Sequence, residues 1–201
     1  KNLEESGTFV ISSREKITEK SRFGEKIYVF EISKREGLEI LTVDDWILAE
    51  SELNKKNILI RLEGYQEIGM GHIYRGLQLA SILFEHNVMF AISHKSQLAI
   101  DKIASSGYKY LVIDGNEDVP GIIQTHKIDI VVNDILNTDK EYIESLKACD
   151  CRVVNLEDLG TGIQSADVVI NDLYEKQNDL PNCYWGQKYY CIKDEFLTAT
   201  P

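Results

Sequence analysis

From residue 57 onward, short runs of β-branched and other apolar residues alternate with segments of helical periodicity. The runs predict strands at 57–62, 88–92, 110–113, 128–132, 152–156 and 167–170, and the segments between them predict helices at 72–86, 96–106, 118–126 and 138–148. Strands that are apolar throughout are buried on both faces, and strands that alternate with helices pair in parallel. The pattern therefore predicts the α/β class, with a Rossmann-like parallel sheet that carries helices on both faces.

Residues 1–55 lack this regularity and are rich in charge, so we expect a separate small α+β segment before a main domain at 56–201. The expected elements of the segment are strands at 8–11 and 27–32 and a helix at 43–53. The helix start is well marked, because Thr42 can cap it and Asp44 and Asp45 lie in its first turn.

The charge of the chain limits its partners. Subtracting 22 basic residues from 33 acidic ones leaves a formal charge of −11, which argues against nucleic acid and anionic membranes. A single phosphorylated ligand remains possible, because it responds to the local field. The chain has no apolar signal region and begins at Lys1 rather than Met, so we expect a cytoplasmic protein cut from something longer.

Cysteine and histidine spacing predicts neither disulfides nor a metal site. We expect free thiols at Cys149, Cys151, Cys183 and Cys191, because a Cys-x-Cys pair is too closely spaced for a zinc knuckle. Three of the four histidines end helices or strands without a ligand partner at metal spacing, and we expect them at the surface: His86, His94 and His126.

The loop after the first strand is the first place to look for a ligand, because ligands of such sheets collect beyond the carboxyl ends of the strands. Gly69 and Gly71 allow close backbone approach there, and the helix that follows offers free N–H groups to an anion. The dinucleotide fingerprint fails because its third glycine is replaced by Tyr74, and the P-loop lysine is absent, so no cofactor is expected. The alternative is a tight packing turn.

His72 follows these glycines at the helix start, where the helix dipole favours a neutral imidazole that can act as a general base. Arg75 lies on the same helix face and can neutralise a phosphate. The alternative role for His72 is hydrogen bonding at the helix start.

Polar residues also end three later strands and should line the same edge of the sheet: Asn133-Asp134, Glu157-Asp158 and Asn171. Such residues are equally common as helix caps and turn formers, so each is open to either interpretation.

Four segments resemble the UDP-sugar hydrolases of pseudaminic acid biosynthesis, a family related to spore-coat polysaccharide proteins and to GT-B glycosyltransferases. They are 68–80 (IGMGHIYRGLQLA), 154–159 (VNLEDL), 166–171 (ADVVIN) and 186–196 (GQKYYCIKDEF). The resemblance covers about residues 57–197 and implies one half of a GT-B fold, with the nucleotide-binding half downstream of Pro201.

This resemblance implies hydrolysis of a UDP-linked amino sugar, with His72 as the base that activates water. It implies that the nucleotide-sugar substrate is bound by Gly69, Gly71, Arg61, Arg75, Asp158 and Asn171. The family pattern is broken at three positions: Glu63 replaces an aspartate, Tyr65 a serine and Leu136 an aromatic residue. These departures leave the sugar open.

Segments 23–32 (FGEKIYVFEI) and 39–50 (EILTVDDWILAE) resemble the tail of CMP-sialic acid synthetases, which are nucleotidyltransferases. Asp45 and Trp46 match that family, whereas Glu39 and Leu41 stand where it has aspartates. The resemblance implies a homodimer contact through residues 1–55, and the alternative is a folded connector.

Three functions remain open from the sequence. The first is a nucleotide-sugar hydrolase of nonulosonic acid or surface polysaccharide synthesis. The second is a glycosyltransferase in which a sugar acceptor replaces water. The third is a non-catalytic binding or scaffold domain.

Overall fold

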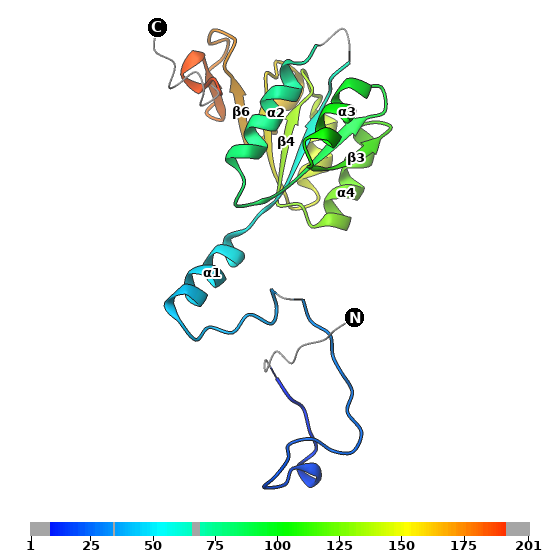
Figure 1. Ribbon diagram of the computed structural model, residues 1–201. Helices are drawn as coiled ribbons and strands as arrows, with labels where there is room; N and C mark the ends of the chain where they lie inside the picture. The colour runs from blue at the N-terminus through cyan, green and yellow to red at the C-terminus, as the bar shows by residue number, and fades with distance from the viewer. Residues whose placement is uncertain (1–8, 34, 66–68, 192–201) are drawn as a thin grey trace, which may run out of the picture. The chain divides into compact units, whose positions relative to one another are not determined.

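A computed structural model describes residues 9–33, 35–65 and 69–191 of the 201-residue chain (Figure 1). The chain divides into two compact units, Lys1–Lys55 and Lys56–Pro201. They are described separately below.

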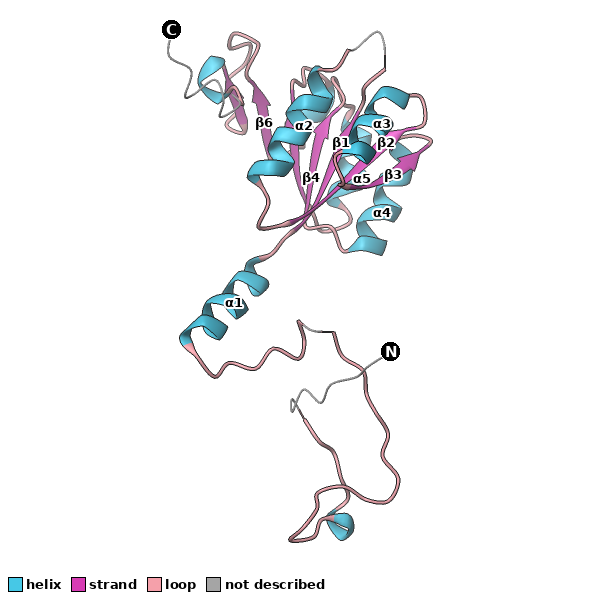
Figure 2. Cartoon of the chain, in the orientation of Figure 1, coloured by secondary structure: helices cyan, strands magenta, loops and turns pink. Residues whose placement is uncertain are grey.

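The second unit is built on a seven-stranded parallel sheet of order β3-β2-β1-β4-β5-β6-β7 (Figure 2). The strands are β1 (Asn57–Leu62), β2 (Asn87–Ser93), β3 (Lys109–Ile113), β4 (Ile130–Asp134), β5 (Arg152–Leu156), β6 (Val168–Asn171) and β7 (Cys183–Trp185). The structure thus confirms the predicted α/β class and the Rossmann-like parallel sheet.

Helices cover both faces of this sheet (Figure 2). They are α2 (Gly71–Ile82), α3 (Gln97–Ser105), α4 (Val119–His126) and α5 (Lys140–Lys147), with short 3₁₀ turns at Asn116–Asp118, Thr161–Gln164 and Gln187–Tyr189. In β1, Leu59 packs into the core with α4 and α5, whereas Ile58 and Ile60 pack into the core with α2 and α3. None of the helices in the described ranges is long and apolar enough to cross a membrane.

Gly76 allows α2 to lie close against the sheet. A Cβ at this position would come within 2.7 Å of Leu62 Cδ2 and 3.4 Å of the Phe90 ring. Both side chains are fully buried, so neither has free space to move into. The absence of a side chain at Gly76 therefore sets how closely the first residues of α2 approach the strand ends.

Most element boundaries shift by no more than one residue from the sequence predictions, and three elements differ by more. β4 begins and ends two residues later than predicted, because its pairing with β1 continues until Leu62 lies opposite Asp134. The helix predicted to 86 ends at Ile82, because the chain must turn before Asn87 pairs with Asn57.

The third difference is at α5. Its N-cap is Asp139, which accepts a hydrogen bond from the Tyr142 N–H, so the helix begins at Lys140 and not at the predicted residue 138. The Thr138 hydroxyl donates instead to Asp158. β7 was not predicted at all, since its three residues make no apolar run long enough to stand out.

In the first unit, α1 (Val43–Asn54) forms as predicted. The Thr42 hydroxyl accepts from the Asp45 N–H and the Asp45 carboxylate accepts from the Thr42 N–H, which is a complete capping box. A 3₁₀ turn spans Arg14–Lys16.

The two strands predicted in the first unit are wrong over the residues that the structure describes. Residues 9–11 and 27–32 form no strand, and Thr8 lies outside the described residues. A strand needs a hydrogen-bonded neighbour, and the described part of this unit supplies none. Many of the described apolar side chains of this unit are consequently exposed, including Tyr28, Val29 and Phe30.

Gly76→Ala should lower the free energy of unfolding by about 1 to 3 kcal/mol, because the added methyl group overpacks the interface between α2 and the sheet. The matched control is Gly121→Ala in α4, where a Cβ would have no neighbour within 4 Å in the described part of the chain. That variant should be neutral or more stable by up to about 1 kcal/mol. Urea unfolding followed by circular dichroism measures both, and equal stability of the two variants would contradict this packing.

Candidate functional site

His72 and Asp134 form a buried pair at the carboxyl edge of the sheet. His72 is the second residue of α2, and Asp134 is the last residue of β4. The His72 Nδ1 atom is hydrogen-bonded to Asp134 Oδ1. His72 is 9% exposed and Asp134 is 0% exposed, so this contact is shielded from bulk water.

The pairing fixes which ring nitrogen of His72 can act as a base. A carboxylate only accepts hydrogen bonds, so Nδ1 must carry the proton that it shares with Asp134. In the neutral imidazole the lone pair is then on Nε2, for which no hydrogen bond to the described residues is recorded. This is the arrangement of an Asp–His pair that accepts a proton at Nε2.

Arg75, one turn further along α2, binds the same carboxylate with two N–H groups. Its Nε donates to Asp134 Oδ2 at 2.9 Å and its Nη2 donates to Oδ1 at 2.5 Å. Burial opposes the charge of Arg75, but the hydrogen bond and charge of Asp134, together with the charges of Asp172 and Glu157, raise the pKa of the guanidinium. Arg75 is therefore a fixed cation engaged with the protein itself, and the predicted phosphate contact would have to compete with Asp134.

Two further carboxyl groups approach Arg75 from the next strands. Glu157 Oε1 and Asp172 Oδ1 each lie 3.9 Å from Arg75 Nη1. Glu157 is 3% exposed, and burial, followed by the hydrogen bond and charge of Asp172, raises its pKa to about 7. Glu157 also has a positive φ of 54°, which non-glycine residues adopt at a cost.

Gly69 and Gly71 border open space next to this cluster. A Cβ on either glycine would meet no atom of the described residues within 4 Å, and Gly69 has a φ of +81°. No described side chain therefore fills the space beside the backbone of these two glycines. Residues 66–68, including the Ile68 of the sequence motif, lie outside the described residues.

The structure does not bring Arg61 to His72. Arg61 is buried and donates to Asn116 Oδ1 at 3.2 Å, to the Leu62 carbonyl at 2.8 Å and to the Glu63 carboxylate. Glu63 in turn accepts from the Ser96 hydroxyl. Arg61 thus belongs to an internal network that holds the start of the loop.

Asp158 and Asn171 are also used internally. The Asp158 carboxylate accepts from the Thr138 hydroxyl and backbone, from the Asn155 amide and from the Gly160 N–H. The Asn171 side chain accepts from the Asp158 N–H and donates to the Asp158 carbonyl. Both residues fix the backbone beside Glu157, and no contact with His72 is recorded for either.

The sequence analysis placed Asp134 and Glu157 at the carboxyl edge of the sheet but did not select them as site residues. It did not consider Asp172. The available signal was side-chain alternation. Val132 belongs to the core under α2, and so Asp134, two residues on, points to the same face. Asn133 points to the other face, where it accepts from the Tyr142 hydroxyl.

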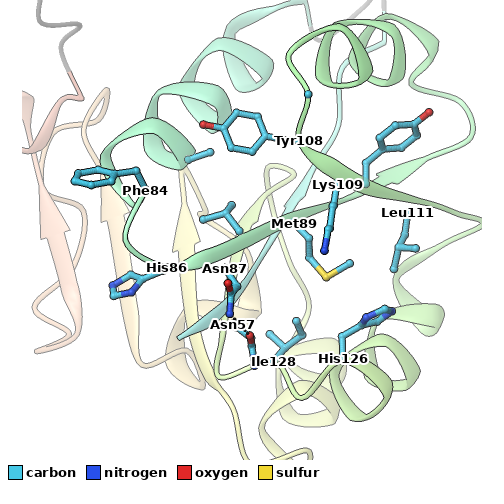
Figure 3. Close-up of a pocket in the computed structure, with 14 residues that line it drawn as sticks. Asn57, Phe84, His86, Asn87, Met89, Tyr108, Lys109, Leu111, His126 and Ile128 are labelled. Carbon is cyan, nitrogen blue, oxygen red and sulfur yellow. Dashed lines mark hydrogen bonds between the residues drawn. The ribbon is translucent and has the colours of Figure 1, made fainter. Parts of the chain in front are cut away.

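A pocket of about 920 Å³ lies at the opposite edge of the sheet (Figure 3). It contains Asn57, Asn87 and Lys109, the first residues of their strands, so it is remote from the carboxyl edge. His86 and His126 also line it, and His86 is half-buried rather than at the surface as predicted. In the described ranges no three His, Cys, Asp or Glu residues group closely enough to hold a metal ion.

The fold and the site define an α/β protein with a buried Asp–His–Arg cluster at the carboxyl edge of a parallel sheet. No protein-family model matches the chain. Over 151 residues the chain is 26% identical to the uncharacterized protein MJ1062 of Methanocaldococcus jannaschii. The aligned part is 69% of this chain but 31% of that protein, so the chain spans less than a third of this relative.

Glu157 makes the stability of the fold depend on pH. Its pKa is about 7 in the folded protein against 4.5 ordinarily, so the folded state binds the proton more tightly than the unfolded chain. The stabilisation is complete below pH 4.5 and is lost as the pH rises through 7. Thermal unfolding of Glu157→Gln should lack this component, seen as a smaller fall in melting temperature between pH 5 and pH 8 than in the wild type. Identical profiles would contradict the raised pKa.

Proposed function

We propose that the unit Lys56–Pro201 is the water-activating half of a nucleotide-sugar hydrolase. The observation that carries this proposal is the hydrogen bond between His72 Nδ1 and Asp134, which leaves Nε2 as the basic nitrogen beside an open glycine loop. The sequence resemblance to UDP-sugar hydrolases supports the choice of substrate class.

In the proposed reaction, His72 Nε2 takes a proton from water as the water oxygen attacks the anomeric carbon of the sugar. The bond between that carbon and the UDP oxygen breaks, and UDP leaves with the bonding electrons. Asp134 stabilises the imidazolium that forms, and Arg75 holds Asp134 in position. The proton then leaves His72 for solvent and restores the base.

We assign binding of the diphosphate to a further domain. The two arginines expected at the substrate are already bound by the protein's own carboxylates, Arg61 by Glu63 and Arg75 by Asp134. The described site is therefore poor in cations for a UDP group. This supports the division of labour implied by the GT-B resemblance.

The test uses a chain extended through the downstream domain and measures UDP release from UDP-amino sugars without an acceptor. His72→Ala should lower the rate by about 10² to 10⁴-fold because it removes the base, and Asp134→Asn should also lower it because the tautomer is no longer fixed. His94→Ala is the matched control, since His94 is exposed.

Unchanged release in His72→Ala would refute the assignment of the base. Release that depends on an added sugar acceptor would instead indicate a glycosyltransferase. If no UDP-sugar reacts and His72→Ala still binds the same partners as the wild type, the unit is a binding or scaffold domain.

We further propose that residues 1–55 mediate homodimer formation. The support is the row of exposed apolar side chains that this unit presents, among them Ile27, Tyr28, Val29 and Phe30. Exposed apolar surface of this kind is typical of segments that bind another chain. The resemblance to the tail of CMP-sialic acid synthetases favours a second copy as the partner.

Sedimentation equilibrium of the 201-residue chain should therefore report a concentration-dependent dimer. Replacing Tyr28 and Phe30 together by Asp should shift the equilibrium to the monomer, because burying two carboxylates in an apolar contact is strongly unfavourable. Glu144→Gln, an exposed substitution in α5, serves as the control. A monomeric wild type at all concentrations would contradict the proposal.

A further inference from the structure

Two buried carboxyl oxygens of the site have no hydrogen-bond partner among the described residues: Glu157 Oε2 and Asp172 Oδ1. The other oxygen of Glu157 is satisfied, since Oε1 accepts from the Asp172 N–H at 2.9 Å and from the Leu173 N–H at 3.3 Å. The residues are 3% and 4% exposed, so water does not readily compensate the two oxygens.

A proton shared between these carboxyl groups accounts for both orphan oxygens. Two carboxylates that meet in a buried site do not both ionise readily, and one proton held between them turns one oxygen into a donor and the other into an acceptor. After burial, the side chain of Asp172 is the next largest cause of the raised pKa of Glu157, as a proton held between the two carboxyl groups requires.

The charge of this pair acts on Arg75, which lies between the pair and Asp134. With one proton bound, the pair carries a single negative charge, and Arg75 makes its short contacts of 2.5 and 2.9 Å with Asp134. Its distances to Glu157 and Asp172 are 3.9 Å. Loss of the proton doubles the charge of the pair and draws the guanidinium away from Asp134.

We propose that Glu157 is a positioning residue of the His72–Asp134 pair: with Asp172 it holds one proton, and this proton keeps Arg75 bound to Asp134. Releasing the proton loosens Arg75 and leaves Asp134 to act on His72 alone. The meaning of this inference for catalysis rests on the proposed function, in which His72 is the base.

The charged groups that face Glu157 come from three neighbouring elements. Asp172, which follows β6, and Arg75 of α2 lie closest to it. His72 of α2 and Asp134 at the end of β4 lie on the other side of Arg75, where both His72 and Arg75 contact Asp134. The adjacent Asp158 is turned away and accepts four hydrogen bonds of its own. Because His72 also contacts Arg75, the test must separate the titration of His72 from that of the acid pair.

The Nε–H signal of Arg75 in nitrogen-15 NMR of the 201-residue chain provides the readout, because this group donates directly to Asp134. We expect the signal to move with pH around a midpoint of about 7 in the wild type. Glu157→Gln should hold it at its low-pH position, since the amide still accepts from the Asp172 N–H and can donate to Asp172 as the shared proton does. Asp172→Asn should hold it likewise.

Two variants serve as controls in this experiment. His72→Gln should retain the transition, which shows that the imidazole does not cause it. Glu144→Gln removes one exposed negative charge elsewhere and should also retain it. A transition that survives Glu157→Gln and vanishes in His72→Gln would overturn the proposal.

A second measurement needs no variant. The carboxyl carbon of Glu157 in carbon-13 NMR should titrate near pH 7, and titration near the ordinary value of 4.5 would overturn the proposal. Neither NMR experiment requires a substrate. If the transition is present and the extended chain releases no UDP, the proposed function fails and the positioning role stands; the converse result rejects the positioning role alone.

Discussion

The carboxylate of Asp134 is the contact on which the candidate site depends. Two residues of α2, one turn apart, converge on it: His72 through Nδ1 and Arg75 through two N–H groups. The convergence is possible because Gly76 lets α2 press against the sheet and because β4 extends to a position level with Leu62. A side chain at position 76, or a β4 that ended before Asp134, would each separate the start of α2 from the carboxylate.

The buried charges around this contact do not cancel one another. Asp134, Glu157 and Asp172 face the single guanidinium of Arg75, and all three carboxyl groups are removed from water. Asp134 accepts the hydrogen bonds of His72 and Arg75. Glu157 and Asp172 are left to each other and to the Asp172 N–H, which donates to Glu157. Burial first, and then the neighbouring Asp172, raise the pKa of Glu157.

The sheet was predictable because its signals are local. Six of the seven strands contain a β-branched apolar run that can be read without knowing the neighbours, and only β7 gave no such signal. The strands predicted in residues 1–55 failed for the opposite reason. The apolar run at 27–32 has the composition of a strand, but the described part of its unit offers no partner to pair with.

The sequence by itself determined the fold class, the edge of the sheet that carries the candidate site, and the place of His72 at a helix start beside two glycines. Tertiary structure alone decided which polar residues meet His72. Asp134 is 62 residues away in the chain and reaches it through the register of β4, whereas Arg61 and Asp158 were drawn into internal networks by neighbours that no local pattern reveals. Hydrogen-bond partners are fixed by distances across strands, and these exist only once the sheet has formed.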